Sequence, residues 1–356
     1  MTLAITNEEA VNLLSMKDCL AALEVAYREL AEGIAVNRPR SDIHTNTPTA
    51  QQTFRFKSME GVVPGLGVTA LRVNSDIVSW PVIDGKQRQI KIMAGPGETQ
   101  CAFIMLFKND TGELLSIIHD SYVQRMRVGA ANGLAVKYLA REDSKTIGLI
   151  GSGWQAGAQL MAMCAVRPIR AVKVYSQNPE HRTAFAREMT EILGIEVRAV
   201  ASGAEAMTGA DIMAAATSSM VPVLFGEWLE SGVHVSGIKR FEIDDSVFKR
   251  ADLTVVHVKE GKGPNYASTN APMEEIPYMK GDPFDLQGMQ RMPELAEVIS
   301  GRHAGRTDKD QITFFMNNIG IGIQFAAAAH VVYQRALECG IGREIPSDIF
   351  LQTWHS

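Results

Sequence analysis

A glycine-rich loop between an apolar strand and a helix has the clearest chemical potential in this sequence. It reads Gly151-Ser-Gly153-Trp154-Gln155-Ala156-Gly157, after the apolar run TIGLIG and at the start of a predicted helix over 155–166. Gly151 permits a tight turn, Gly153 lets the backbone approach a pyrophosphate, and Ala156 lets helix and strand pack closely. The helix N-terminus then faces the negative charge. Because strand, loop and helix agree, the motif predicts dinucleotide binding, with Trp154 and Gln155 near the cofactor. The alternative is a glycine turn in a domain without a cofactor.

The end of the next predicted strand bears on the choice of cofactor. NAD-binding domains usually carry Asp or Glu there, which binds the ribose hydroxyls. This chain has Ser176-Gln-Asn178 instead, and its first carboxylate, Glu180, comes in the following helix. Ser176, Asn178 and Arg182 could hold a 2′-phosphate, although Asn178 precedes a proline and could simply cap the helix. We therefore expect NADP, with NAD as the alternative, because no carboxylate stands where it would repel a phosphate.

A regular alternation of strands and helices must position these loops. Apolar runs recur between helical segments such as 180–193, which predicts a parallel, doubly wound sheet. We expect an α/β fold, with this Rossmann sheet inserted in a second α+β domain formed by the N-terminal part and the C-terminal helix. The expected strands are 146–151, 171–176, 196–201, 211–216, 234–238 and 253–258.

The segments before the glycine loop predict the first part of the second domain. Capping-box spacings at Thr6 and Ser15 indicate helix over 6–33. The runs AFIMLF and ELLSIIHD, separated by a DTG turn, predict an antiparallel hairpin, and a helix is expected over 121–140.

The C-terminal third predicts the rest of that domain. The stretch 260–310 is polar and rich in Pro and Gly, so loops with short helices are expected there. The strand ITFFM and a long helix over 319–339 follow. We place a substrate-binding and dimerisation domain at 1–125 plus 315–356 and the Rossmann NAD(P)-binding domain at 126–314.

The bulk composition excludes several classes of protein. The chain has 356 residues, 46% of them hydrophobic, and a net charge of −5, which argues against a nucleic-acid partner. Four scattered cysteines fit a reducing compartment better than a disulfide framework, and the histidines lack metal-ligand spacing, so no metal is expected. The N-terminus lacks the pattern of a signal peptide and no apolar run approaches a membrane span, so we expect a cytoplasmic protein without a membrane partner.

Four segments resemble the ornithine cyclodeaminase/μ-crystallin family: QRMRVGAANGLAVKYLA, GLIGSGWQAG, VPVLFGEWLESGVHVSGI and ITFFMNNIGIG. The resemblance covers nearly the whole chain. It implies a homodimer built through the split outer domain, an NAD(P)-binding Rossmann domain and a small amino or imino acid held between the two domains. It also implies one of the family's activities, which include ornithine cyclodeaminase, alanine dehydrogenase and reductases of cyclic ketimines or other imino acids.

The resemblance also assigns catalytic residues. It implies that Arg40 grips the substrate carboxylate through two parallel hydrogen bonds and that Arg127 lies near the carboxylate and the cofactor. Arg72 stands where the family carries a lysine beside the reacting carbon, and arginine is a poor proton donor at neutral pH. Lys57 could supply the mobile proton instead. The alternatives are a surface arginine for Arg40 and a solvated strand lysine for Lys57.

The remaining expected cofactor contacts follow from the same resemblance. Thr99 would contact the nicotinamide side, with a plain strand threonine as the alternative. Further contacts are expected at Ala216, Thr217, Ile238 and Asn318.

Three segments differ from the family pattern. The cyclodeaminases have a Gly-Asp-x-Pro-Gly-Lys loop whose aspartate acts on the substrate side-chain amine, whereas Lys239 and Arg240 stand here and could cover the cofactor. Glu242 and Asp244 are expected to cap the next helix. The family's later helix aspartate is Gln324. The insert 79–97 is longer than the family's and could shape the substrate pocket.

We therefore expect an NAD(P)H-dependent reductase of a small imino acid or cyclic ketimine, or in reverse an amino acid dehydrogenase, with hydride transfer at the α-carbon. Holding donor and acceptor in one geometry and stabilising charge at the nitrogen would supply the rate. The alternatives are a cyclodeaminase-type ammonia lyase, which uses NAD as an internal cofactor, and a non-catalytic NADP- or ligand-binding protein.

Overall fold

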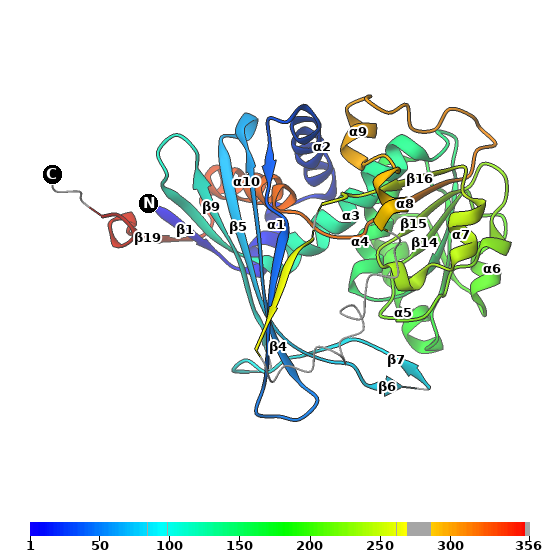
Figure 1. The fold of residues 1–356 in the computed structure, drawn as a ribbon, viewed down its shortest axis with the longest axis horizontal. Helices are drawn as coiled ribbons and strands as arrows, with labels where there is room; N and C mark the ends of the chain where they lie inside the picture. Colours follow the sequence, from blue (N-terminus) through cyan, green and yellow to red (C-terminus); the bar gives the residue numbers. More distant parts are fainter. Residues whose placement is uncertain (84, 98, 261, 269–285, 353–356) are drawn as a thin grey trace.

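Two β-sheets lie side by side, with helices between them and around them (Figure 1). The computed structural model describes residues 1–83, 85–97, 99–260, 262–268 and 286–352. No helix among these residues is long and apolar enough to cross a membrane.

The smaller sheet is fully parallel, as predicted. Its order is β13-β12-β11-β14-β15-β18-β16, and each expected strand matches an observed one within two residues at either end. Parallel neighbours require crossover connections, and helices make most of them. The helices are α4 (Trp154–Val166), α5 (Pro179–Leu193), α6 (Gly203–Met207) and α7 (Asp245–Arg250). The strands are β11 (Thr146–Ile150), β12 (Ala171–Tyr175), β13 (Glu196–Ala199), β14 (Ile212–Ala215), β15 (His234–Gly237), β16 (Leu253–Val256) and β18 (Thr313–Met316). The predicted α/β fold class is confirmed.

The strand order reverses between β11 and β14. From β11 the chain proceeds to β12 and β13 on one side, and then returns to β14 on the other side. Ligands of doubly wound sheets bind in the crevice beyond the carboxyl ends of the strands at such a reversal. The glycine loop follows β11 directly at this point.

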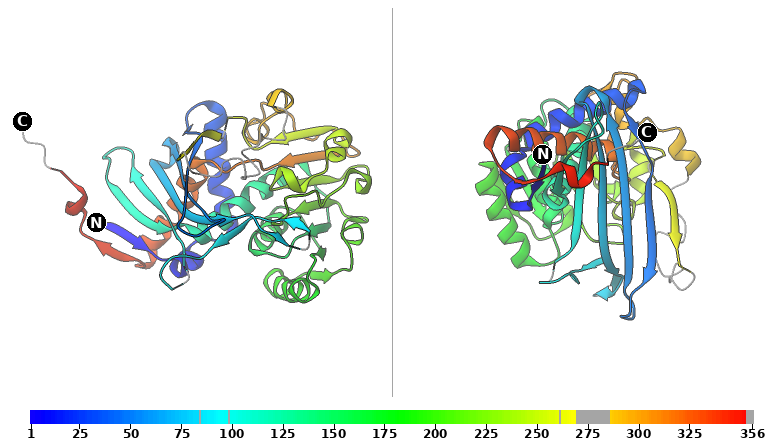
Figure 2. Two further views of the ribbon diagram at one scale, coloured as in Figure 1. Left: turned by 60° about the horizontal axis from the view of Figure 1, so that its bottom comes forward. Right: turned by 90° about the vertical axis from the view of Figure 1, so that its left-hand side faces the viewer.

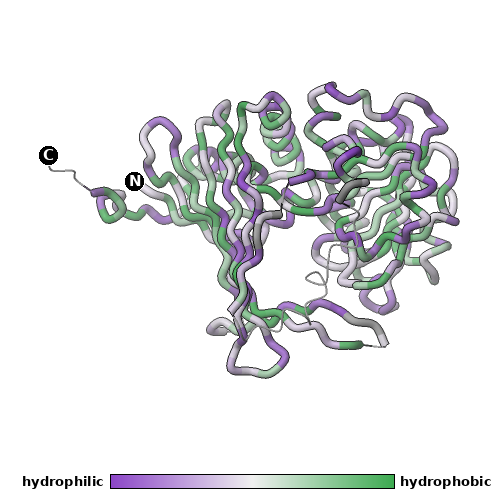
Figure 3. The backbone as a smooth tube through the Cα atoms, viewed as in Figure 1, coloured by the Kyte–Doolittle hydropathy of each residue, from purple (hydrophilic) through white to green (hydrophobic). Residues whose placement is uncertain are grey.

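The larger sheet is mixed and runs in the order β17-β3-β4-β5-β9-β10-β1-β19. Hydrophilic segments are interspersed along its long strands (Figure 3). Figure 2 shows these strands from two further directions. Its strands are β1 (Thr2–Ile5), β3 (Arg40–Asn46), β4 (Thr53–Val63), β5 (Val68–Ser79), β9 (Cys101–Lys108), β10 (Leu114–His119), β17 (Lys262–Ala267) and β19 (Arg343–Ile345), with β2 (Val36–Asn37) and β8 (Ile90–Ile92) paired beside them. β9 and β10 form the predicted antiparallel hairpin.

Helices pack against one end of this sheet through an apolar core. The helix α2 (Met16–Glu32) and the helix α10 (Gly322–Cys339) contribute to it, together with buried strand residues such as Met59, Ala70 and Ile104. The predicted helix over 6–33 is divided, because the chain leaves α1 (Asn7–Leu13) at Leu14 and Ser15 caps α2.

Two expectations for the C-terminal third need correction. The long helix begins at Gly322 rather than at 319, because the Gln324 side chain accepts the backbone N–H of Ile321 and caps the helix there. Residues 262–267 form β17, a parallel edge strand beside β3, where a proline is tolerated. Residues 269–285 of the predicted loop region lie outside the described residues, and the short helices α8 (Leu286–Gln290) and α9 (Leu295–Ile299) follow.

The helix α3 (Asp120–Leu139) joins the two sheets and packs closely on α4. A Cβ atom added at Gly129 would lie 2.5 Å from the Ala158 carbonyl oxygen, and one at Gly133 would lie 2.8 Å from the Ala162 Cβ atom. Glycine at these positions therefore lets the two helix backbones approach. This contact holds α3, which carries Arg127, beside the helix that follows the glycine loop.

Candidate functional site

The glycine loop has the backbone geometry that its sequence predicts. Gly151 has a φ of 116°, and an added Cβ atom would lie 2.2 Å from the Ala216 carbonyl oxygen. Gly153 is the N-cap of α4, and a Cβ atom there would meet no atom within 4 Å. Ala156 is fully buried. The loop thus turns sharply against β14 and leaves open space in front of the α4 N-terminus, where a pyrophosphate fits.

Two side chains of the loop lie beside α3. Trp154 is 52% exposed, and the Arg125 guanidinium carbon lies 4.0 Å from its ring centroid. Gln155 donates a hydrogen bond to the Gln124 amide oxygen at 3.0 Å. The indole is therefore half-exposed beside α3, and its contact with a cofactor stays a prediction.

The residues after β12, where a ribose was expected to bind, are tied together by hydrogen bonds. The Ser152 hydroxyl donates to the Ser176 hydroxyl at 2.8 Å, which ties this turn to the glycine loop. Arg182 donates to the Ser176 carbonyl oxygen at 2.8 Å, and Asn178 caps α5 by accepting the His181 N–H at 2.9 Å. Asn178 thus caps the helix, which was the alternative to a role in phosphate binding. The strand end from Tyr175 to Asn178 carries no carboxylate.

The other expected cofactor residues lie around the ends of neighbouring strands. Ala216 donates its N–H to Ile150, and Ile238 is partly buried in the same core. The amide oxygen of Asn318 accepts the His257 N–H at 3.2 Å, so this side chain already braces the segment after β16. Thr99 is exposed and donates to the Pro96 carbonyl oxygen at 2.8 Å in the loop before β9. Their contacts with a cofactor stay predictions.

A buried carboxylate joins the loops after β14 and β15. Asp244 caps α7 as expected. Glu242 does not cap that helix, because it lies in the preceding turn, where its carboxylate accepts the backbone N–H of Thr217 and, at 3.2 Å, that of Lys239. Burial raises the Glu242 pKa, although Lys239 opposes the rise. Glu242 therefore fixes the backbone of Thr217, where a cofactor contact was expected.

The expected catalytic residues of the larger sheet lie on one of its faces. Cross-strand register places Lys57 of β4 opposite Asn74 of β5 and Asp42 of β3. In the next row, Arg55 lies between His44 and Asp76. These polar residues and the nearby Arg72 are buried. This end of the sheet therefore buries charged and polar side chains on a face where apolar ones would be usual. We call these residues and Arg40 the polar face.

Every cation expected to act on this face has an acidic partner. Arg40 lies 2.8 Å from Asp42, Lys57 lies 2.7 Å from Asp76, and Arg72 lies 2.5 Å from Asp120 at the start of α3. Asp76 also contacts Arg55 at 3.1 Å and Lys91 at 3.0 Å. Buried charges need such partners, because isolated charges are strongly destabilised in the interior.

The ionisation of Lys57 is shifted by its surroundings. Burial lowers the Lys57 pKa well below its usual value, Arg55 lowers it further, and Asp76 only partly offsets these effects. Burial alone would raise the Asp76 pKa, but Lys57, Lys91 and Arg55 outweigh it and lower that pKa. A lysine in this environment can release a proton much more readily than a solvated lysine.

Arg127 is buried between α10 and the polar face. Its guanidinium carbon lies 4.7 Å from the Phe325 ring centroid, and that of Arg72 lies 5.2 Å from the same centroid. Burial lowers the Arg127 pKa to about 10, and Arg72 contributes in the same direction. Arg127 therefore remains charged at neutral pH, and the two arginines lie around one aromatic ring.

A chain of hydrogen bonds holds Arg127 from behind. Arg127 donates to the Gln324 oxygen at 3.0 Å, and the Gln324 nitrogen donates to the Tyr27 hydroxyl at 2.9 Å. The Tyr27 hydroxyl lies 2.6 Å from the His257 Nε2 atom, and His257 Nδ1 contacts the Ile319 carbonyl oxygen. Burial lowers the His257 pKa to about 4, so its ring is neutral at physiological pH. The neutral ring then donates from Nδ1 and accepts from Tyr27 at Nε2.

A family model matches this chain. The model of the ornithine cyclodeaminase/mu-crystallin family matches residues 86–340. The chain belongs to this family. The resemblance expected from the motifs is confirmed.

Relatives of known activity or structure cover almost the whole chain. The Delta(1)-pyrroline-2-carboxylate reductase of Bacillus cereus is 30% identical over 348 residues, which cover 96% of this chain and 99% of that protein. The structure of the Thermococcus litoralis Delta(1)-pyrroline-2-carboxylate reductase with NADH and L-proline has a TM-score of 0.77 at 30% identity and covers 97% of this chain and 100% of that chain. An archaeal alanine dehydrogenase dimer with bound NAD has a TM-score of 0.75 at 28% identity, with coverage of 97% and 99%.

A dinucleotide fits the crevice of this family member on structural grounds. Gly153 leaves the α4 N-terminus open, and the exposed Trp154 ring offers an apolar surface beside it. Backbone N–H groups at a helix N-terminus favour a phosphate group. The glycine loop would hold the pyrophosphate and the residues after β12 would hold the adenosine ribose.

The partners of the expected catalytic cations were missed from the sequence. Asp42 holds Arg40 from two residues along the same strand, whereas Asp76 holds Lys57 from the neighbouring strand and Asp120 holds Arg72 from the start of α3. A signal was present, because every second residue in RSDIH, TFRFK and LRVNSD is polar, with the charges on one strand face. The cross-strand register that brings them together cannot be read from those segments alone.

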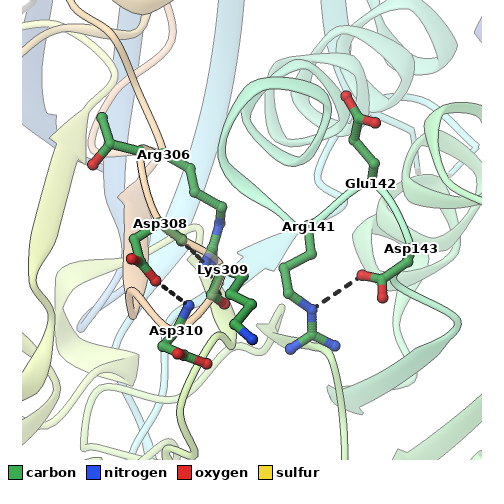
Figure 4. A pocket seen from close by; sticks show the side chains of 8 residues that line it. Arg141, Glu142, Asp143, Arg306, Asp308, Lys309 and Asp310 are labelled. Carbon is green, nitrogen blue, oxygen red and sulfur yellow. Dashed lines mark hydrogen bonds and ion pairs between the residues drawn. The ribbon is translucent and has the colours of Figure 1, made fainter.

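A polar surface pocket lies at the opposite edge of the smaller sheet (Figure 4). It is lined by the loops before β11 and β18, and its charges are largely used within these loops. Arg141 contacts Asp143 at 3.2 Å, and Arg306 donates to the Leu139 carbonyl oxygen at 2.6 Å. Because this edge is formed by the amino ends of the strands, the pocket lies away from the carboxyl ends, where the glycine loop lies.

Proposed function

We propose that this chain is an NAD(P)H-dependent reductase of a small imino acid or cyclic ketimine, which in reverse acts as an amino acid dehydrogenase. The observation that carries the proposal is a buried lysine of lowered pKa on a cationic face, joined through α3 to the glycine-loop helix. The names of the relatives, which reduce an imino acid or oxidise an amino acid, support the same reaction class.

The arginines would bind and orient the substrate. Arg127 and Arg40 would hold the carboxylate, since a guanidinium pairs with it through parallel hydrogen bonds. Arg72, whose charge is fixed by Asp120, would stabilise charge around the imine. The chain from Gln324 to His257 would keep Arg127 in one orientation.

Lys57 would supply the proton. A bound reduced nicotinamide supplies the hydride that adds to the imino carbon. Lys57 would transfer a proton from Nζ to the imino nitrogen and become neutral, while Asp76 keeps its ammonium group oriented before transfer. Burial lowers the Lys57 pKa well below its usual value, which makes its ammonium group a stronger acid than that of a solvated lysine.

NADP is the cofactor that we propose for this reaction. The strand end at Tyr175–Asn178 has no carboxylate to bind the ribose hydroxyls or to repel a 2′-phosphate. Ser176 exposes a hydroxyl there, tied to Ser152 of the glycine loop. Equilibrium binding of NADPH and NADH to the purified protein tests this preference directly.

We also propose a homodimer formed through the domain at 1–125 plus 315–356, with 126–314 as the nucleotide domain. The short edge strand β19 and the segment after it support this proposal, because Ile349, Phe350 and Leu351 are exposed apolar residues at the outer edge of the larger sheet. Exposed apolar patches often mark contacts between subunits. Light scattering after size exclusion should give twice the mass of the chain.

The experiment that tests the function follows nicotinamide absorbance with NADPH or NADH and a panel of imines. The panel contains cyclic ketimines and small 2-oxo acids mixed with ammonia or methylamine. Oxidation that depends on the imine is the expected result. Ammonia released from ornithine or lysine with catalytic NAD, without imine reduction, would support the lyase instead. Nucleotide binding without either reaction would support a binding protein.

A further inference from the structure

The insert between β5 and β9 reaches from the larger sheet to the nucleotide edge of the smaller one. Its strands β6 (Val82–Ile83) and β7 (Lys86–Gln87) pair in an antiparallel hairpin, and β8 returns to pair with β5. In Figure 1 this hairpin extends from the lower end of the larger sheet toward α5. We call the described residues 80–83 and 85–92 the arm.

The arm meets the smaller sheet at Arg88. The Arg88 guanidinium donates to the side-chain oxygen of Gln177, and its backbone forms a bridge with Ser219. The Arg88 N–H also donates to the Pro81 carbonyl oxygen at 2.9 Å, which holds the arm in shape before it crosses. Arg88 is thus held by the smaller sheet, through Gln177 and Ser219, and by the arm itself, through Pro81.

The two contacts fall at informative places in the fold. Gln177 lies two residues beyond the end of β12, where a doubly wound nucleotide domain recognises the adenosine ribose. Ser219 lies in the segment after β14, on the other side of the glycine loop that follows β11. The arm therefore crosses the carboxyl ends of β12 and β14, over the adenosine half of the proposed site.

Arg88 is the cation best placed for a 2′-phosphate. Arg182, which we expected there, already donates to the Ser176 carbonyl oxygen and lies over the Tyr175 ring at 5.5 Å. The partner of Arg88 is a neutral amide, so its charge is uncompensated by this contact. An arginine guanidinium presents five N–H donors, and Gln177 uses only part of that capacity.

We propose that Arg88 recognises the 2′-phosphate of NADP, so that cofactor choice is made by a residue of the substrate domain rather than by the nucleotide domain alone. Gln177 holds the guanidinium over the ribose edge, and the phosphate adds a charge-assisted bond to it. The inference rests on the proposed nucleotide site and deepens it. It also assigns the long insert to the cofactor rather than to the substrate pocket.

The test measures equilibrium binding of NADPH, NADH and adenosine 2′-monophosphate by calorimetry, for the wild type and for Arg88→Met. Loss of one hydrogen bond to a charged group corresponds to about a tenfold to hundredfold change in Kd. We expect Arg88→Met to raise the Kd of NADPH and of adenosine 2′-monophosphate by at least about tenfold, with the Kd of NADH changed less than about twofold.

Two matched variants complete the test. Arg88→Lys should retain part of the NADPH affinity, because a lysine keeps the charge but loses the planar fork. Arg187→Met removes an exposed charge from α5 and should leave every Kd unchanged. Equal weakening of NADPH and NADH by Arg88→Met, or no change in either, would overturn the assignment. Wild-type protein that binds NADH but not NADPH would overturn it and leave the reductase standing, whereas failure to bind either nucleotide would refute the proposed function itself.

Discussion

The glycine loop and the polar face adjoin one helix but are built in different ways. The glycine loop acts through backbone geometry, with a sharp turn at Gly151 and an open N-terminus at Gly153. The polar face acts through buried or half-buried cationic side chains, each held by a carboxylate from its own strand, a neighbouring strand or α3. One region therefore depends on the absence of side-chain atoms and the other on their pairing.

This difference separates the effects of substitution. A methyl group added to the glycine loop occupies space near the backbone, so its effect depends on the local φ angle and on the atoms that it would meet. A charge removed from the polar face leaves a buried partner uncompensated, and its effect depends on how many groups share that partner. The predictions below test each half of the comparison.

The largest effects are expected at the two loop glycines, which should fail in different ways. Gly151→Ala places a side chain at a φ of 116° and against the Ala216 carbonyl, so it should lower stability by about 2 kcal/mol or more and abolish nucleotide binding. Gly153→Ala has free space around its Cβ, so stability should be kept while nucleotide affinity falls. Thermal unfolding without nucleotide and calorimetric binding distinguish them. Equal stability losses would contradict this account of the loop.

Removal of the buried proton donor should have the next largest effect. Lys57→Met should lower kcat for imine reduction by about a hundredfold or more, because a general acid typically contributes that much. The free energy of unfolding should fall less in Lys57→Met than in Asp76→Asn. Asp76→Asn leaves Lys57 and Arg55 without their shared carboxylate, so it should lower the free energy of unfolding by about 3–5 kcal/mol. Kinetics and denaturant unfolding measure the two effects. An unchanged kcat in Lys57→Met would exclude Lys57 as the donor.

The pH profile sharpens this assignment. Reduction needs Lys57 protonated, so the rate should fall as the pH rises through the Lys57 pKa, which lies well below its usual value. In Lys57→Arg the group stays protonated, and this alkaline decline should disappear from the remaining activity. An identical decline in the wild type and Lys57→Arg would show that another group limits the reaction.

A smaller effect is expected from the hydrogen-bond chain behind Arg127. Gln324→Met removes the bond to Arg127, so KM for the imino acid should rise by about tenfold while kcat changes less. Tyr27→Phe removes a more distant bond and should change KM only slightly. A loss of stability with both kinetic constants unchanged would mean that Gln324 does not position Arg127.

The smallest effect at neutral pH comes from two buried histidines that lie outside both regions, His234 at the start of β15 and His257 after β16. Burial lowers the pKa of His234 to about 3 and that of His257 to about 4, so the unfolded chain takes up protons first as the pH falls below 6.5. Stability should therefore decrease from pH 6.5 toward pH 4, by up to about 1.4 kcal/mol per pH unit for each histidine. Urea unfolding across this range measures the slope. His257→Asn should remove one histidine's share, and an unchanged slope would show that His257 is already charged.

Sequence reasoning succeeded where the determinants are local. Short patterns predicted the glycine loop, the strands β11 to β16 of the parallel sheet and the β9–β10 hairpin. Each of these depends on residues that are neighbours in the sequence. The start of α10 was misplaced, since its cap is formed by the Gln324 side chain. The edge strand β17 was missed because its segment contains glycine and proline and pairs with a strand more than two hundred residues away.

The polar face and the arm show the limit more clearly. Lys57 was expected to act, but Asp76, which pairs with its ammonium group, joins it only through strand register. Arg88 reaches Gln177 across the two sheets, and no local pattern encodes that contact.

The direct measurement of the central claim follows a single hydride. The protein is supplied with NADPH carrying deuterium on nicotinamide C4, prepared separately with each stereochemistry, and with an imino acid that the substrate panel identifies. We expect one of the two deuterated nucleotides to give the amino acid with one deuterium at the α-carbon, detected by mass spectrometry. An amino acid formed without deuterium from either nucleotide, or no reduction of any imino acid in the panel, would contradict hydride transfer at the α-carbon.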